Sequence, residues 1–194
     1  EGGDTHPPNP NDFVMLPAIQ TFRIGVDSAL VVSSNADLDE QPNFWVTLGT
    51  QAASETMIQR YETTNAIYLD YLNEGLSKAV PTLVRRADNR IYETATGRMI
   101  INLAVSRIFF DTNIDALTIQ SGYEHHPVTG VSWCGADSYC IAYGLRLPSE
   151  AEWEIATKGD SASWNYTWGR TVDQGDPTGG RARANFVDSG DPFP

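Results

Sequence analysis

The sequence predicts an α+β protein with short strands, few helices and many loops. One observation behind this is a pair of short helices with a tight break between them, within residues 132–159. Another is a series of short β-branched and aromatic runs separated by Gly, Pro, Asn and Asp. The 194 residues fit one domain, and their five Trp and eight Tyr suit loops that pack through aromatic side chains.

The first helix of the pair is expected to follow Ser132 and Trp133. Its apolar side chains recur at three- and four-residue steps, at Ala136, Tyr139, Cys140 and Tyr143. Gly144 should end it, because glycine adopts the left-handed conformation after a helix without steric cost.

The second helix is expected to begin after Ser149. Glu152 stands three residues later and completes a capping box, in which the two side chains bond the first backbone amides of the helix. Trp153 and Ile155–Ala156 are predicted to form its buried side. Lys158–Gly159 should end it, with a cation and a glycine.

The chain before residue 78 divides into several expected elements. Residues 1–12, rich in Pro, Gly, Asn and Asp, should form a flexible arm. Strands are predicted within 13–25, 44–48 and 57–62, with an insertion at 26–43. A helix should follow, with one apolar face and an end near 73–75; that face consists of Ile67, Tyr68, Tyr71 and Leu72.

The stretch from 79 to 122 has a weaker pattern. Strands are expected at 90–93 and 107–110, turns at 88–89 and 96–97, and a further strand-like segment at 117–122. After the second helix we expect a loop at 160–163, a short aromatic strand or turn at 166–169, and irregular chain at 173–180.

Three ordered segments carry a family resemblance. They are V-S-W-x-x-A-x-x-Y-C at 131–140, G-x-R-L-P-S-E-A-E-W-E at 144–154 and Y-T-W-G at 166–169. Together they resemble the domain of the formylglycine-generating enzyme, or sulfatase-modifying factor, family. The matching motif residues, expected to have structural roles, are Trp133, Cys140, Arg146, Ser149, Glu152, Trp153 and Trp168.

The resemblance implies a C-type-lectin-like fold. Two earlier segments support it: residues 13–25 resemble the opening of the family domain, and E-T-T-N at 62–65 resembles a motif that leads into a helix. The resemblance runs from residue 13 to about 186, the N-terminal two-thirds of the family domain. We therefore expect 13–194 to form a single such domain that lacks its C-terminal part.

The two cysteines decide what chemistry can be expected. Cys134 and Cys140 lie six residues apart on one predicted helix, about 9 Å along its axis, which is too far for a disulfide. Catalytic family members bind copper through a pair of cysteines in the C-terminal part of the domain. This chain contains no segment that resembles that part. No copper site is therefore expected here, because Cu(I) requires converging thiolates.

Calcium is the one cofactor that the resemblance suggests. Ala184-Asn185-Phe186 resembles a step at which the family supplies a calcium ligand pair, so Asn185 and Phe186 are predicted metal ligands. Oxygen donors in an irregular acidic loop are what Ca²⁺ prefers. The other ligands are expected after Pro194, and Asp188 could substitute for one of them.

Other polar clusters are interpreted as structural. His125 and His126 beside Glu124 could suggest zinc, but adjacent residues point apart and a third ligand is missing. The carboxylates at 150, 152 and 154 suit the start of a helix, where its dipole favours negative charge. Arg146 is expected to be a buried or half-buried ion-pair partner of one of them.

The net charge of the chain limits the classes of partner that it can bind. A formal net charge of −12 argues against nucleic acid and anionic membranes, although the same charge also serves plain solubility. No apolar run approaches the roughly 20 residues of a transmembrane helix.

The favoured function is a non-catalytic domain that acts as a binding or accessory structural subunit of an extracytoplasmic (periplasmic or secreted) assembly. The chain is expected to need a protein partner or its missing C-terminal continuation. The alternative is a truncated formylglycine-generating oxidase or iron-dependent sulfoxide synthase with catalytic residues beyond Pro194. A variable ligand-binding lectin-like protein is a third interpretation.

Overall fold

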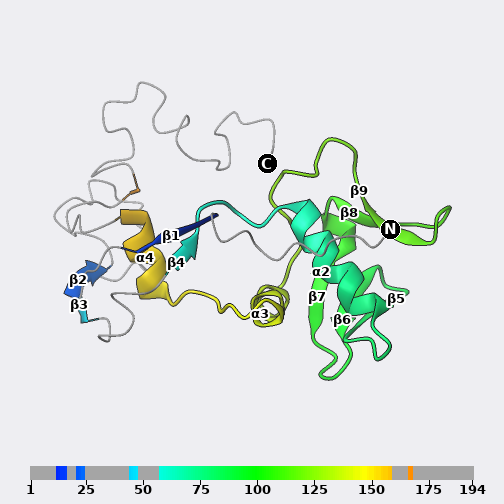
Figure 1. Ribbon diagram of the computed structural model, residues 1–194, viewed down its shortest axis with the longest axis horizontal. Coiled ribbons are helices and arrows are strands. Elements are labelled where there is room, and N and C mark those ends of the chain that lie inside the picture. Colours follow the sequence, from blue (N-terminus) through cyan, green and yellow to red (C-terminus); the bar gives the residue numbers. More distant parts are fainter. Residues whose placement is uncertain (1–11, 17–20, 25–43, 48–56, 159–165, 168–194) are drawn as a thin grey trace, which may run out of the picture. The chain divides into compact units, whose positions relative to one another are not determined.

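The computed structural model describes residues 12–16, 21–24, 44–47, 57–158 and 166–167. In this part of the chain three α-helices accompany short antiparallel strands in small sheets, which confirms the α+β class and its few helices (Figure 1). The chain divides into two compact units. One contains residues 1–14 and 59–147, and the other contains 15–58 and 148–194. The expected single domain over 13–194 stays a prediction.

The described residues of the first unit form two α-helices and two antiparallel sheets. Its helices are α2 (Asn65–Ser77) and α3 (Trp133–Ala142). A three-stranded sheet has the order β5 (Leu83–Arg86), β6 (Arg90–Glu93) and β7 (Met99–Asn102). A short 3-10 helix, η3 (Leu103–Val105), leads to a hairpin of β8 (Ile108–Asp111) and β9 (Ala116–Ile119).

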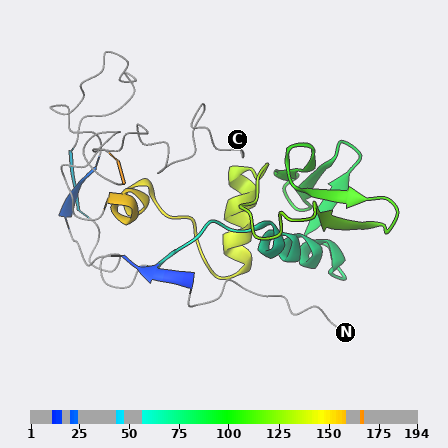
Figure 2. The ribbon, with the colours of Figure 1, turned by 90° about the horizontal axis from the view of Figure 1, so that it is seen from above.

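The helices pack on these sheets in different places. α2 contacts β5 and β9, whereas α3 contacts β7 and a part of α2. Figure 2 shows α2 running along the sheets of this unit and α3 crossing beside its N-terminal end. Helix and sheet faces that are apolar thus cover one another, which is how small α+β layers exclude water.

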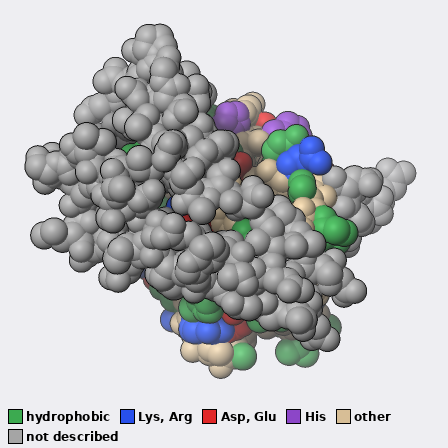
Figure 3. All heavy atoms as spheres, turned by 90° about the vertical axis from the view of Figure 1, so that its left-hand side faces the viewer, with side chains coloured by type: hydrophobic (Ala, Val, Ile, Leu, Met, Phe, Trp, Pro, Cys, Tyr) green, Lys and Arg blue, Asp and Glu red, His purple; other side chains and the backbone are tan. Residues whose placement is uncertain are grey.

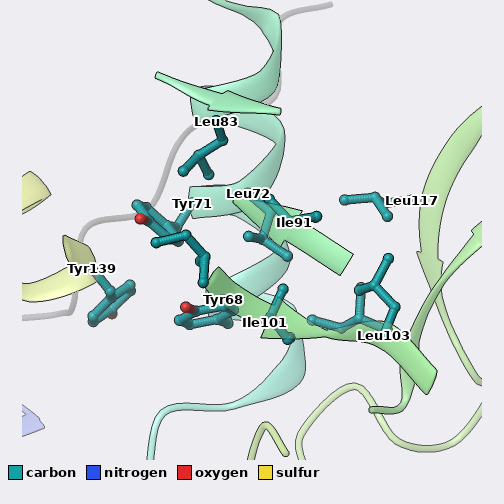
Figure 4. Close-up of a cluster of buried hydrophobic side chains, with 11 residues drawn as sticks. Tyr68, Tyr71, Leu72, Leu83, Ile91, Ile101, Leu103, Leu117 and Tyr139 are labelled. Carbon is teal, nitrogen blue, oxygen red and sulfur yellow. The ribbon is translucent and has the colours of Figure 1, made fainter. Parts of the chain in front are cut away.

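The core of this unit is a mixed aliphatic and aromatic cluster. Its fully buried aliphatic side chains come from helix α2 and all three strands of the larger sheet and its neighbour β8 (Figure 4): Leu72, Leu83, Ile91, Ile100, Ile101 and Ile108. Tyr68 and Tyr71 from α2 meet Tyr139 from α3, with ring centroids 5.2–5.6 Å apart. Such edge-to-face and stacked pairs add to the hydrophobic stabilisation.

A glycine sets the distance between α3 and β7. A Cβ atom at Gly135 would lie 2.1 Å from the carbonyl oxygen of Ile100 and 2.9 Å from the Tyr68 hydroxyl. Only a residue without a side chain permits this approach. The N-terminal turn of α3 therefore packs directly on the backbone of β7.

The second unit has fewer described residues. Helix α4 (Glu150–Lys158) accompanies β2 (Thr21–Ile24) and β3 (Phe44–Thr47), which pair antiparallel. Its small apolar core joins buried Leu16 and Ile155 to half-buried Ile58. β1 (Phe13–Met15) pairs with β4 (Met57–Gln59), and the chain passes between the two units within these strands.

Several predicted boundaries needed correction. The strand expected at 57–62 ends at Gln59, and the helix expected to end near 73–75 continues to Ser77. The turns at 88–89 and 96–97 are confirmed, since Asn89 and Gly97 have φ values of 61° and 69°. The arm at 1–11 and the insertion at 26–43 lie outside the described residues.

Candidate functional site

Helix α3, which carries both cysteines, is fixed at its two ends. The Ser132 hydroxyl accepts a hydrogen bond from the Gly135 amide (3.0 Å) and donates to the Met99 carbonyl. At the other end Gly144 has a φ of 69°, as predicted for the residue after the helix. Cap and sheet together determine which helix positions face the core.

The cysteines of α3 do not form a pair. Both are free, half-buried thiols, and Cys140 packs against the core. Six helical residues separate them by about 9 Å along the axis. The two thiols therefore do not fit a Cu(I) ion, which needs converging thiolates.

The environment of Cys140 keeps its thiol protonated. Burial raises the pKa of the Cys140 thiol, and the nearby Asp137 carboxylate raises that pKa further. A reactive cysteine needs the opposite, a pKa lowered by cations or a helix N-terminus. The position therefore suits packing rather than catalysis.

The tyrosines beside Cys140 are also structural. Burial raises the pKa of Tyr68 and Tyr139 far above the ordinary tyrosine value. Tyr71 donates a hydrogen bond to the Ser138 hydroxyl (2.9 Å), which joins α2 to α3. A phenol whose pKa is raised in this way does not act as an acid or base near neutral pH.

A buried asparagine is the feature that sequence reasoning missed. Asn65 is fully buried, and its side-chain Nδ2 donates to the carbonyls of Tyr123 (2.9 Å), His126 (3.1 Å) and Pro127 (3.4 Å). Its backbone amide also donates to the His126 carbonyl (2.9 Å). One side chain thus ties the start of α2 to the loop at 123–127. The signal in the sequence was the combination of E-T-T-N at 62–65 with His126-Pro127 about 60 residues later.

The two histidines belong to that loop. His126 is half-buried and its ring lies 4.9 Å from that of Tyr123, whereas His125 is exposed. Histidine side chains are visible at the surface in Figure 3. The part of the chain that the structure describes holds no group of three His, Cys, Asp or Glu side chains arranged for a metal.

The start of α4 confirms the predicted capping box. The Glu152 carboxylate accepts bonds from the Ser149 amide (2.8 Å) and hydroxyl (2.9 Å), and Ser149 Oγ accepts from the Glu152 amide (3.3 Å). Glu152 is only 3% exposed. The carboxylate at 154 pairs with Lys158 one turn later. These acidic residues therefore stabilise the helix and its ends.

Two expectations about this region were wrong. Trp153 is 57% exposed, because the buried side of the helix consists of Glu152 and Ile155, with Ala151 and Ala156 beside them. Arg146 is exposed rather than buried, and its guanidinium donates to the Leu147 carbonyl (3.2 Å). The mean spacing of apolar residues in such a short helix did not define its buried face.

Trp133 is also on the surface, at 68% exposure, as is Ile141 at 66% on the same helix. The remaining predicted site residues, Trp168 and the calcium ligands Asn185 and Phe186, lie outside the described residues. Among the described helices, none has the length and apolar character that crossing a bilayer requires.

Comparison with known proteins identifies the class. The model of the sulfatase-modifying factor enzyme 1-like domain matches residues 35–190, so the chain belongs to this family. The resemblance drawn from the sequence motifs is thereby confirmed, together with the α+β architecture. The C-type-lectin-like arrangement stays a prediction, and no solved structure matches the chain.

Parts of this chain are similar to parts of curated proteins that have different names. A serine/threonine-protein kinase Pkn1 of Chlamydia trachomatis is 42% identical over 46% of this chain and 13% of its own length. The formylglycine-generating enzyme of Streptomyces coelicolor is 48% identical over 34% and 20%. A mouse protein named inactive C-alpha-formylglycine-generating enzyme 2 is 49% identical over 22% and 14%. The matches therefore span at most a fifth of these relatives.

Proposed function

We propose that this chain is a non-catalytic member of the family and acts as a binding or accessory structural subunit of an extracytoplasmic assembly. The observation that carries the proposal is the position of the two thiols. Cys134 and Cys140 lie on one helix, and Cys140 faces the core with its thiol pKa raised. The two thiols do not converge on a copper ion, and the Cys140 thiol is not activated to attack a substrate.

The relatives support a role that does not depend on one chemistry. Similar segments occur in proteins named as kinases, as a formylglycine-generating enzyme and as an inactive homologue. Site residues rather than the fold determine activity, so a shared scaffold with different names suits a binding module. In larger proteins such a module would act beside other domains or a protein partner.

The second candidate is an enzyme whose catalytic residues lie beyond Pro194. The 48% identity to the Streptomyces coelicolor formylglycine-generating enzyme favours it, since this chain spans only 20% of that protein. An oxygen-dependent oxidase or an iron-dependent sulfoxide synthase would then be completed by the continuation of the chain.

Copper binding tests whether Cys134 and Cys140 themselves form a catalytic site. The 194-residue chain and its Cys134→Ala/Cys140→Ala variant are titrated with Cu(I) buffered by a competing chelator. We expect the same copper uptake by both and no formylglycine in a cysteine-containing sulfatase peptide analysed by mass spectrometry. Stoichiometric copper that the double variant loses, or a converted peptide, would contradict the non-catalytic role.

The native protein supplies a second test. Its intact mass is measured together with its bound metals. A mass near 21.3 kDa without copper or iron supports an accessory subunit. A much larger protein containing either metal supports the enzyme candidate.

Calcium is proposed at Asn185 and the backbone carbonyl of Phe186. Carboxamide and carbonyl oxygens are ordinary calcium ligands, and the sequence around them is acidic. Calorimetric titration of the chain with CaCl₂ should give a binding isotherm that Asn185→Ala weakens at least tenfold. Asn35→Ala is the matched control, and equal isotherms for all three proteins would rule the site out.

A further inference from the structure

Positive charge in this acidic chain is concentrated in one segment. Residues 78–107 contain six of the 13 Lys and Arg residues but only two of the 25 Asp and Glu residues, a net charge of +4. The other seven cations and 23 acidic residues carry −16. This segment contains all three strands β5, β6 and β7, so one sheet of the first unit is basic.

Both acidic residues of the segment are already paired. Asp88 accepts from Arg90 (3.2 Å) and from the Tyr92 hydroxyl (2.6 Å), and Glu93 pairs with Arg98 (3.3 Å). Arg85 and Arg86 have no carboxylate partner among the described residues, and both are exposed. They are therefore the cations of the sheet that remain available to an outside anion.

Aromatic rings hold these two guanidinium groups in place. The Cζ atom of Arg85 lies 3.6 Å from the centre of the Phe110 ring, and that of Arg86 lies 4.2 Å from the centre of the Tyr92 ring. Stacking restricts the side chain while its N–H groups stay free to donate. Binding of an anion here therefore costs less side-chain conformational entropy than binding to flexible lysines would.

The two arginines lie on an edge strand. β5 is the outer strand of the order β5-β6-β7, as Figure 1 shows. The Thr94 amide donates to the Thr82 carbonyl (2.9 Å), so 82–94 is a hydrogen-bonded pair of the β5–β6 ladder. By alternation the pairs Val84–Tyr92 and Arg86–Arg90 are hydrogen-bonded as well.

It follows that Leu83 and Arg85 direct their backbone N–H and C=O groups away from β6. In the described part of the chain no other backbone group bonds them. Such an edge accepts an additional strand, because the incoming backbone satisfies these groups. Arg85 and Arg86 point to opposite sheet faces, as successive strand residues do.

We propose that the edge strand β5 binds an extended acidic peptide segment of a partner protein by strand addition. The backbone of the segment pairs with Leu83 and Arg85, and two of its successive carboxylates bond the guanidinium groups of Arg85 and Arg86. This deepens the binding role proposed above and rests on it.

Charge favours such a partner over other anionic molecules. A long nucleic acid would meet the −16 of the remaining chain, and two copies that each carry −12 repel one another. Charged residues on an edge also prevent strand pairing between like molecules. A short acidic strand is the case in which the same charges attract.

The probe is a capped, fluorescently labelled octapeptide in which Glu-Asp pairs alternate with Val. Anisotropy is measured with the full 194-residue chain at low and high salt. We expect binding that weakens at high salt, a loss of at least tenfold in affinity for Arg85→Gln/Arg86→Gln, and less than threefold for Arg107→Gln/Arg146→Gln. The second variant removes the same charge from exposed arginines outside the edge.

Amide hydrogen exchange gives a readout specific to strand addition. The peptide should slow exchange at Leu83 and Arg85, whereas Val84 and Arg86 already bond β6 and should not change. Equal losses in both double variants, tighter binding of a heparin oligosaccharide, or unchanged exchange at Leu83 and Arg85 would each overturn the proposal. So would a homodimer that Arg85→Gln/Arg86→Gln dissociates.

These outcomes are separable from those of the proposed function. A chain that ignores the peptide and also takes up no copper at its cysteines leaves the non-catalytic role intact and removes only this surface. A chain that binds the peptide and converts a sulfatase cysteine keeps the surface and removes the non-catalytic role.

Discussion

Helices α2 and α4 begin in two different ways. At α4 the amides of the first turn are satisfied locally, by Ser149 and by Glu152 three residues later. At α2 the fully buried Asn65 bonds carbonyls that are 58 to 62 residues away in the sequence. The start of α4 is held by its own turn, whereas the start of α2 combines a local Thr64 cap with bonds to a distant loop.

The difference shows which contacts define the fold of the first unit. A capping box stabilises one helix end by about 1 kcal/mol. A buried amide side chain that bonds several carbonyls joins two segments, and its loss removes all of these side-chain hydrogen bonds at once. The following variants test this contrast, in order of decreasing effect.

Asn65→Ala should be the most damaging change. It removes the three side-chain hydrogen bonds to the carbonyls of Tyr123, His126 and Pro127 and leaves a small cavity, at a total cost of roughly 4 kcal/mol in the free energy of unfolding. The Tyr123 and His126 carbonyls keep one backbone donor each, the amides of His126 and Asn65. Urea denaturation of the chain measures this cost. Asn73→Ala, at an exposed position of the same helix, should change stability by less than about 0.5 kcal/mol. Similar costs for both variants would show that the backbone bonds hold the loop without the Asn65 side chain.

Gly135→Ala tests the start of α3, which has both a local cap and a close contact with a distant strand. α3 has a local Ser132 cap, yet the new Cβ would meet the Ile100 carbonyl at 2.1 Å. Overpacking should cost roughly 3 kcal/mol and expose the Cys140 thiol to a thiol reagent. Ala142→Gly at the exposed end of the helix should cost about 1 kcal/mol or less and leave thiol reactivity unchanged. Unaltered reactivity in Gly135→Ala would mean that α3 shifts without loss of packing.

Ser149→Ala should have a small and local effect. Removal of the cap should cost about 1 kcal/mol and speed amide exchange only within α4. Ser149→Asp keeps a capping acceptor and should restore protection. A loss of protection that spreads into α2 would break the contrast between the two helix starts.

Glu124→Gln should change the acid sensitivity only slightly. Backbone hydrogen bonds, including one from the Gly122 amide (3.3 Å), lower the pKa of the Glu124 carboxyl below its ordinary value of 4.5. Its contribution is therefore complete above pH 4.5 and is lost as pH falls through the lowered pKa. The variant should show a flatter decrease in melting temperature below pH 4.5, whereas Glu150→Gln should retain the original decrease. Identical curves for Glu124→Gln and the unmodified chain would contradict the assignment.

The difference between local and long-range contacts also explains which features could be predicted from the sequence. The starts of α3 and α4, with their Ser132 and Ser149 caps, were predicted because each signal lies within one turn. β5 and β7 were not predicted, since strand pairing depends on neighbours rather than on a four-residue pattern. The role of Asn65 escaped for the same reason. Trp153 was placed on the wrong face because a nine-residue helix offers too few positions to define one.

The long-range bond of Asn65 also has a consequence for biosynthesis. On a translating ribosome the amide of Asn65 emerges 58 residues before the carbonyl of Tyr123. At about 5–20 residues per second, roughly 3–12 s pass before the two groups can meet. During that interval the nascent α2 has its aromatic face uncovered, which makes it a natural target for a chaperone that holds apolar helices.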